Sequence, residues 1–330
     1  MNFVSSIRAA LLGRFSGLTK DQLRRDLLAG LNVATMALPL SMAFAIASGV
    51  NPERGLFTAI IGGAIVAALG GSRVQIGGPT GAFVIITFSV MSQYGLSGLL
   101  LCTMIAGAML VIMGVARLGS IIRFMPYPVS RAFTKGIAVL ILSTQIKFVF
   151  GLQADMPAAT IGKLQVLAAN LGTIHWPTVA LAVASVTLMG LWPARLARYV
   201  PGSMVGLIVM TLGFTAVQTL NGGDGFGIAT IGSQFPHFSG ALPALQLPSL
   251  DLGQLGDLVQ PAFTIAMLVA IQALMCAVVT DGVLDERHDS NQELIGQGVA
   301  NMVGPLFGCI PVTGAVARSV VNVRSGARTP

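Results

Sequence analysis

The chain has 330 residues, of which 54% are hydrophobic and only 9% are charged, and its formal net charge is +7. Soluble domains carry about 25% charged residues, and one soluble core of this size could not bury so much apolar surface. Composition therefore excludes an ordinary soluble domain. Because the basic residues lie between long apolar runs, as topology signals do, a nucleic-acid partner is also disfavoured.

Residues 1–26 are interpreted as a cytoplasmic basic segment. Phe3–Phe15 is predicted to be a basic amphipathic helix on the membrane surface. The segment lacks an apolar core followed by a cleavage site, so it does not resemble a secretory signal.

Ten membrane helices are predicted from length and apolarity. Two runs, Gly98–Ala116 and Trp176–Ala194, contain no charge and are close to the roughly 20 residues that cross a bilayer. The longest connection is 223–257, which is expected to be extramembrane. The ten predicted segments are 27–48, 55–71, 77–94, 97–116, 129–150, 174–194, 201–220, 258–282, 291–308 and 311–323.

Lys and Arg are more frequent in every second connection, which predicts a multi-pass protein of the plasma (inner) membrane with a cytoplasmic N-terminus. The inner connections would hold Arg73, Arg117, Arg123, Arg195, Arg198, Arg287, Arg324 and Arg328.

Two of the predicted helices begin with a break. The third opens on Gly77-Gly78-Pro79-Thr80-Gly81-Ala82-Phe83, and the tenth opens on Pro311-Val312-Thr313-Gly314-Ala315-Val316-Ala317-Arg318. Pro lacks the N–H that a helix interior needs, and Gly tolerates non-helical backbone. Both stretches are therefore expected to be extended, with a short helix starting after each, buried in protein or lining a wet cavity.

The two Thr-Gly-Ala breaks are 233 residues apart. The first and eighth segments start about 231 apart and the second and ninth about 236 apart, so three consecutive segments share nearly one offset. We interpret this as a repeat, with seven helices in 27–222 and a partial second unit in 258–330. An odd number of crossings makes the second unit inverted, and four further helices are expected to complete it.

Paired broken helices point two helix N-termini at one site near the bilayer midplane. Helix N-termini carry partial positive charge and free N–H groups, which favour an anion. Arg318, on the first turn after the second break, would add full positive charge. The alternatives are that Arg318 snorkels or pairs structurally with a carboxylate.

Five stretches resemble the SulP family of sulfate-permease-type anion transporters. They run from residue 26 to the end, and the last is the most specific. They are Asp26-Leu-Leu-Ala-Gly-Leu-Asn-Val-Ala with Leu38-Pro39 and Ala43-Phe44-Ala45; Thr80 and its neighbours; Phe124-Met-Pro-Tyr-Pro-Val with Phe133-Thr-Lys-Gly136 and Gln145; Asn291-Gln-Glu-Leu294 with Gln297-Gly298 and Asn301; and Gly308-Cys-Ile-Pro-Val-Thr-Gly-Ala-Val-Ala-Arg-Ser319 with Ser325-Gly-Ala-Arg-Thr329.

The resemblance implies an all-α polytopic membrane protein with a seven-plus-seven inverted-repeat transporter fold. It further implies core and gate domains, elevator-like movement and a homodimer of the full-length protein. Helices eleven to fourteen and a cytoplasmic STAS domain, which family members usually have, are not within these 330 residues. The second repeat is thus expected to be incomplete in this chain.

The resemblance also places an anion site between the third and tenth helices, lined by the first and eighth. Phe44 could instead pack against lipid or core, and Thr80 could be a structural cap. Carried over residue by residue, the site comprises Leu40, Phe44, Thr80, Gly81, Gln272, Cys276, Ala315, Val316, Ala317 and Arg318.

By resemblance, the sequence departs from the family pattern at three positions: Leu40, where many relatives carry a polar residue, Gln272, where many carry an acidic residue, and Cys276, where sodium-coupled bicarbonate members carry an Asp. The departures weaken a sodium site and remove the obvious proton carrier, so coupling to a proton or sodium ion stays open. Glu293 is interpreted as a helix cap or dipole partner. The three cysteines are interpreted as packing residues, and no chemistry is assigned to His175, His237 or His288.

The main hypothesis is a secondary transporter of a small anion such as sulfate, bicarbonate, chloride or a dicarboxylate. The alternatives are a nucleobase permease of the same fold, which would need carboxylates on the eighth and tenth helices, and a non-transporting membrane motor or scaffold. No metal cluster, cofactor motif or nucleophile–base pair is found in the sequence, so an enzyme is not expected.

Overall fold

The computed structural model divides into two compact units, Met1–Arg131 with Ser239–Pro330 (unit 1) and Ala132–Phe238 (unit 2). The predicted helix Phe3–Phe15 and His237 lie outside the described residues. The structure describes residues 19–119, 127–152, 160–193, 196, 202–222, 226–236, 238, 243–245, 253 and 255–329.

Unit 1 begins with a long helix, α2 (Lys20–Ala47), capped by the Thr19 hydroxyl, which accepts from Gln22 N at 3.3 Å. The second predicted span is one continuous helical path made of α3 (Pro52–Phe57), the π-helical turn η1 (Thr58–Gly62) and α4 (Gly63–Leu69).

The first break is extended, as predicted, and forms strand β1 (Gly77–Gly78). A 3-10 turn, η2 (Gly81–Phe83), follows and leads into α5 (Val84–Val115). Gly95 interrupts α5 with φ 66° and ψ −171°, a left-handed conformation that suits glycine. The predicted boundary between the third and fourth segments therefore falls at this kink.

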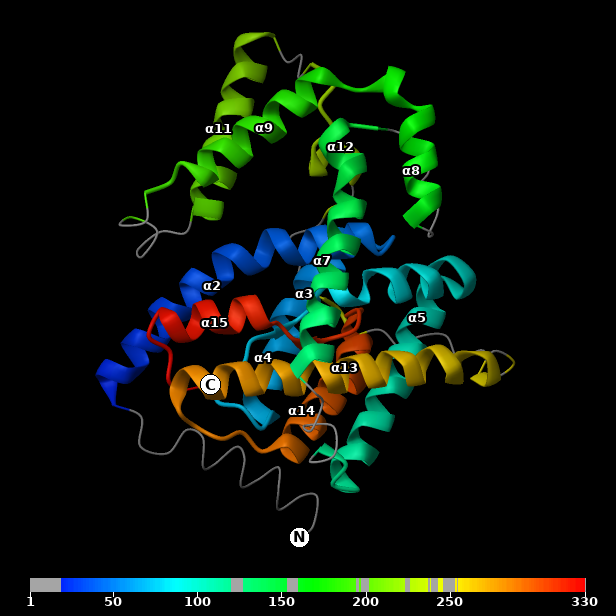
Figure 1. Cartoon of the computed structure of the whole chain (residues 1–330), viewed down its shortest axis with the longest axis vertical. Coiled ribbons are helices and arrows are strands. Elements are labelled where there is room, and N and C mark those ends of the chain that lie inside the picture. The colour runs from blue at the N-terminus through cyan, green and yellow to red at the C-terminus, as the bar shows by residue number, and fades with distance from the viewer. Residues whose placement is uncertain are drawn as a thin grey trace. The chain divides into compact units, whose positions relative to one another are not determined.

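The C-terminal part of unit 1 repeats this order of elements. It contains α13 (Leu255–Leu284), α14 (Ser290–Val303), the 3-10 turn η5 (Gly304–Phe307), strand β2 (Thr313–Gly314) and α15 (Val316–Arg324). Figure 1 shows α15, in red, between α2 and α13, and it packs against both. The match of helix, helix, strand and helix supports the predicted repeat; its limits, 27–222 and 258–330, stay predictions.

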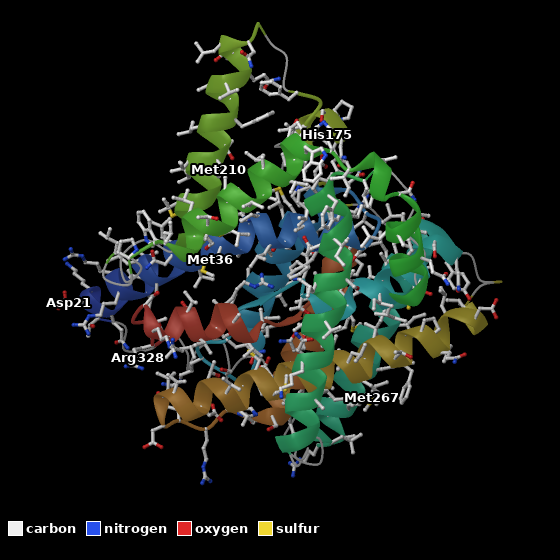
Figure 2. All side chains as sticks on the ribbon, turned by 45° about the horizontal axis from the view of Figure 1, so that its top comes forward. Asp21, Met36, His175, Met210, Met267 and Arg328 are labelled. Atoms are coloured by element: carbon white, nitrogen blue, oxygen red, sulfur yellow. The ribbon has the colours of Figure 1, made fainter. Side chains whose placement is uncertain are left out.

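Unit 2 is helical in its described part. Its connection 160–169, predicted as a loop, forms helix α8. The His175 ring, at the start of α9 (Figure 2), hydrogen-bonds the Thr178 hydroxyl at 2.8 Å. The elements are α7 (Tyr127–Phe150), which enters from unit 1, α8 (Thr160–Ala169), η3 (Leu171–Thr173), α9 (Trp176–Gly190), α11 (Gly202–Leu220) and α12 (Ile231–Gln234).

Within the described ranges, five helical stretches are long and apolar enough to span a membrane: Lys20–Ala47, Pro52–Leu69, Gly81–Val115, Gly202–Leu220 and Leu255–Leu284. Large apolar side chains stand exposed on α2, α9 and α11, among them Leu31, Val186 and Leu212. Exposed apolar faces on such helices fit contact with lipid, as the composition predicts.

Helices α5 and α14 pack with their backbones in close approach. A Cβ added at Gly298 would lie 2.7 Å from Val111 N and 2.8 Å from Gly107 O. Small residues permit this distance, as at many membrane helix interfaces. The packing fixes α14 against the helix that follows the first break.

We therefore expect Gly298→Ala to destabilise the protein by about 1–3 kcal/mol, because the added methyl group overpacks the α5–α14 contact. Gly213→Ala, on α11, is the matched control, since a Cβ there would meet no atom within 4 Å. Thermal melting of the full-length protein in detergent would measure both. Equal melting temperatures for the two variants would contradict the close packing.

Candidate anion site

The two breaks meet as an antiparallel pair of strands. Gly77 pairs with Gly314 and Gly78 with Thr313. A Cβ at Gly314 would lie 2.0 Å from the Gln75 amide nitrogen, so a larger residue there would displace the Gln75 side chain. The ladder joins the broken segments of both repeats and satisfies backbone groups that lipid could not.

Each strand is followed by the start of a helix. Thr80 is extended (φ −134°, ψ 156°) and precedes η2 and α5, and Ala315 is extended (φ −103°, ψ 99°) and precedes α15. Ala315 N donates to Ile76 O at 2.9 Å, which continues the ladder by one bond. Extended residues precede a helix start at both breaks, as predicted. Gly81–Phe83 of the first break, however, forms the 3-10 turn η2 instead of extended backbone, and of the two helices only α15 is short.

Arg318 extends from the first turn of α15 to the other broken segment. Its side chain is 3% exposed, and its Nη2 donates to Pro79 O. Its Nη1 has no hydrogen-bond partner among the described residues, and a Cβ on Gly78 would lie 2.7 Å from this atom. Arg318 forms no ion pair with a carboxylate of the described residues. The predicted alternative of a structural ion pair is therefore not observed.

Gln272 and Thr80, both predicted site residues, are in contact. Gln272 Nε2 lies 3.1 Å and its Oε1 3.3 Å from the Thr80 hydroxyl, and both side chains are more than nine-tenths buried. The pair connects α13 to the start of the first half-helix. The Thr80 hydroxyl caps no backbone N–H of η2, so the cap alternative is not observed.

Cys276 lies one helical turn beyond Gln272 and contacts the tenth-helix region. Its thiol donates to the Ser319 hydroxyl at 3.3 Å, and this hydroxyl accepts from Ile76 N at 2.9 Å. Ser319 thus links α15 to α13 and to the segment before β1. Ser319 is not among the site residues predicted from the sequence.

The remaining predicted residues lie on α2 and at the two half-helix starts. On α2, Leu40 is 39% exposed and Phe44 is half-buried. The other members differ in burial, and their place in an anion site stays a prediction: Ala315 is buried, Gly81 and Val316 are half-buried, and Ala317 is exposed.

Glu293 does not cap its own helix, which is one of the two roles expected from sequence, but it lies in the first turn of α14, where a dipole role places it. Asp289 is the N-cap of α14, and its carboxylate accepts from Asn291 N and Gln292 N. The fully buried Glu293 carboxylate instead accepts from Gly71 N at 2.7 Å. The position of Glu293 in the first turn is compatible with a cap. The backbone N–H groups that its carboxylate binds nevertheless come from the connection between α4 and β1.

His288 also has partners that the sequence did not reveal. Its Nδ1 lies 2.6 Å from an Asp281 carboxylate oxygen, and its Nε2 lies 2.9 Å from the Ser290 hydroxyl. The three residues join the end of α13 to the start of α14. No group of three or more His, Cys, Asp or Glu suited to a metal ion occurs among the described residues.

An apolar groove of about 810 Å³ follows one face of α9 in unit 2. No charged side chain lines it, so it offers an anion no favourable partner and fits lipid better. Its lining residues are Trp176, Val179, Ala180, Val183, Ala184, Thr187, Leu188 and Leu191.

Spanning helices, two paired breaks and a buried arginine at a half-helix start together define a polytopic helical transporter fold. A family model for the sulfate permease family matches residues 23–330. The chain belongs to this family.

Two relatives show the extent of the similarity. The chain is 42% identical to "Putative sulfate transporter YvdB" of Bacillus subtilis, over 96% of the chain and 59% of that protein. It is 33% identical to the bicarbonate transporter BicA of Picosynechococcus, over 93% of the chain and 54% of that protein. The chain therefore spans little more than half the length of these relatives.

Solved structures confirm the fold. The transmembrane domain of a cyanobacterial BicA matches with a TM-score of 0.80 and 32% identity, over 94% of this chain and 79% of that one. Murine Slc26a9 in the inward-facing state matches with a TM-score of 0.82 over 99% of this chain and 57% of that one. At 18% identity the second match shows the fold alone.

Gly78→Ala should displace the Arg318 guanidinium from Pro79 O, because the new methyl group would lie 2.7 Å from Nη1. We expect a loss of about 1–3 kcal/mol, as for a buried polar group that loses its partner. In a double-mutant cycle with Arg318→Ala, melting temperatures should show coupling, since removing the guanidinium removes the clash. Strictly additive effects would contradict the contact.

Proposed function

We propose that the full-length protein is a secondary transporter of small anions, such as sulfate, bicarbonate, chloride or a dicarboxylate, working by elevator-type alternating access. One observation carries the proposal: a buried guanidinium at the start of α15 has a nitrogen without a hydrogen-bond partner among the described residues. An arginine at membrane depth is costly unless it faces a partner or a cavity. A small anion is the partner that fits.

The surroundings of Arg318 reinforce positive potential. The N-terminal end of α15 carries partial positive charge, and the neighbouring Gln272 is neutral. The Gln272 amide has a second N–H besides the one that it donates to Thr80, and this N–H is a further donor. An anion between these groups would replace water with charge-assisted hydrogen bonds, which are the stronger class.

The relatives' names support the substrate class. YvdB is named for sulfate and BicA for bicarbonate. A nucleobase permease would need carboxylates for a neutral ring, whereas this chain presents Gln272 and Arg318. The division into two compact units is what an elevator movement requires. A cytoplasmic N-terminus and a homodimer belong to the proposal, with coupling to a proton or sodium ion to be identified by the uptake measurements.

Arg318→Ala should raise the KM for the transported anion at least about tenfold, because one charge-assisted interaction is lost. Arg318→Lys should recover part of the affinity, since a point charge replaces a planar fork. Arg324→Ala, an exposed arginine of the same helix, is the matched control. Uptake is measured in proteoliposomes with sulfate, bicarbonate, chloride, dicarboxylates and uracil, with and without pH and sodium gradients.

Uracil uptake without anion uptake would reject the proposed function. Charge movement without any flux would identify a motor instead. Unchanged anion affinity in Arg318→Ala would remove the electrostatic basis of the proposal.

Gln272→Glu should make anion uptake fall as pH rises. The new carboxyl would lie beside Thr80, and its ionised form would repel the anion, while its protonated form keeps a hydrogen-bond donor. We expect a KM several-fold higher when the carboxyl is ionised, and a KM near that of the unmodified protein at low pH. Uptake across a pH series measures this. An identical pH profile in Gln272→Glu and the unmodified protein would place Gln272 outside the site.

A further inference from the structure

Helix α14 carries three polar side chains on one face, Glu293, Gln297 and Asn301, spaced four residues apart. All three are 0% exposed. Burying such groups in a membrane helix is costly unless each is hydrogen-bonded. We call Glu293, Gln297 and Asn301 the α14 polar stripe; its partners come from both broken segments.

At one end of the stripe, Glu293 holds the connection that leads into β1. Its carboxylate accepts from Gly71 N at 2.7 Å, Ser72 N at 3.0 Å and Gln75 Nε2 at 2.9 Å. Gln297 Nε2 adds a fourth donor at 2.8 Å. A carboxylate has about four lone-pair sites, so these donors fill it.

The two glutamines show how strongly the carboxylate orients its surroundings. Gln75 and Gln297 both turn their NH₂ groups to Glu293, and each leaves its own Oε1 without a partner in the described part of the chain. Gln75 also lies against β2, because a Cβ at Gly314 would come within 2.0 Å of its Nε2. Glu293 thus binds the segment before β1 directly and is linked to β2 through Gln75.

At the other end, Asn301 binds the residue before β2 as a neighbouring strand would. Its Oδ1 accepts from Val312 N at 2.9 Å, and its Nδ2 donates to Val312 O at 2.8 Å. The same Nδ2 donates to Gln297 O at 2.8 Å. One side-chain amide therefore satisfies both backbone groups of Val312, which lipid could not do.

We propose that the α14 polar stripe is a positioning device that holds the two half-helix starts in register for anion binding. The segment before β1 is tied to Glu293, the segment before β2 is tied to Asn301, and one rigid helix fixes the spacing between them. The stripe residues touch no anion; they act through Thr80, Pro79 and Arg318. The expected effect on the KM for the anion rests on the proposed function. The expected effect on backbone hydrogen exchange does not.

Asn301→Asp provides a titratable test. Its protonated carboxyl would still donate to Val312 O and accept from Val312 N, whereas the ionised form would lose the donor and repel Val312 O. Hydrogen exchange of the full-length protein in detergent is followed by mass spectrometry. We expect exchange in 310–316 to rise about tenfold at pH 8 relative to the intrinsic rate, and exchange in 74–80 to rise with it through the ladder.

In proteoliposomes the same variant should raise the anion KM at least about fivefold at pH 8, with little change in kcat, and should approach the normal KM near pH 5. Glu293→Gln tests the other end: exchange at 70–76 should rise, and the change should extend to 310–316. Asn291→Ala is the matched control, because this asparagine of α14 binds Gly119 N instead of a broken segment.

Faster exchange confined to the mutated end, or equal changes in Asn291→Ala, would overturn the proposal. Should Asn301→Asp fail to fold, Glu293→Gln decides by the same two exchange measurements. If the unmodified protein transports no anion, the proposed function fails, whereas the exchange results still test whether the stripe sets the register of the two breaks.

Discussion

Backbone N–H and C=O groups inside a membrane need partners, and this chain leaves two stretches of them outside any helix. The structure depends on how these groups are satisfied. Residues 77–78 and 313–314 pair with each other, and the flanking residues bind side chains of α14 and α15. Because lipid offers no hydrogen bonds, this arrangement fixes the two breaks against each other.

The same constraint explains the residue types near the breaks. Glycine occurs where the strands meet neighbours too closely for a side chain, as at Gly314 against Gln75. The π-helical turn η1 serves the same end: the Thr58 hydroxyl accepts from Ile310 N at 2.9 Å, and a Cβ at Gly62 would come within 2.3 Å of Val312. Irregular helix geometry often accompanies a functional site. Here the π-helical turn packs against the residues that precede β2.

The proposed function depends on a charged nitrogen near the paired breaks that has no protein partner in the described part of the chain. Most donors near the ladder are used by protein acceptors, but one nitrogen of Arg318 is not, within the described residues. Polar contacts brought together for structural reasons thus surround one positive group at the start of a half-helix. Gln272 is neutral, so the α13 side chain beside Thr80 adds no negative charge to this region.

The sequence by itself determined the membrane class, the two extended breaks, the order of the repeated helices and the position of Arg318. Apolar length, Pro and Gly at fixed places and charge spacing are local signals, and they suffice for these features. It also placed Gln272 and Thr80 in one site by family resemblance, and their contact is present.

Only the tertiary structure decided which backbone and side-chain groups form hydrogen bonds with one another. The pairing of the strands, the reach of Arg318 to Pro79 across 239 residues of sequence, and the partners of Glu293 join segments from opposite ends of the chain. Glu293 could be mistaken for a helix cap because a first-turn carboxylate suits either role. Its donors come from a connection 221 and 222 residues away, and no local periodicity encodes that distance.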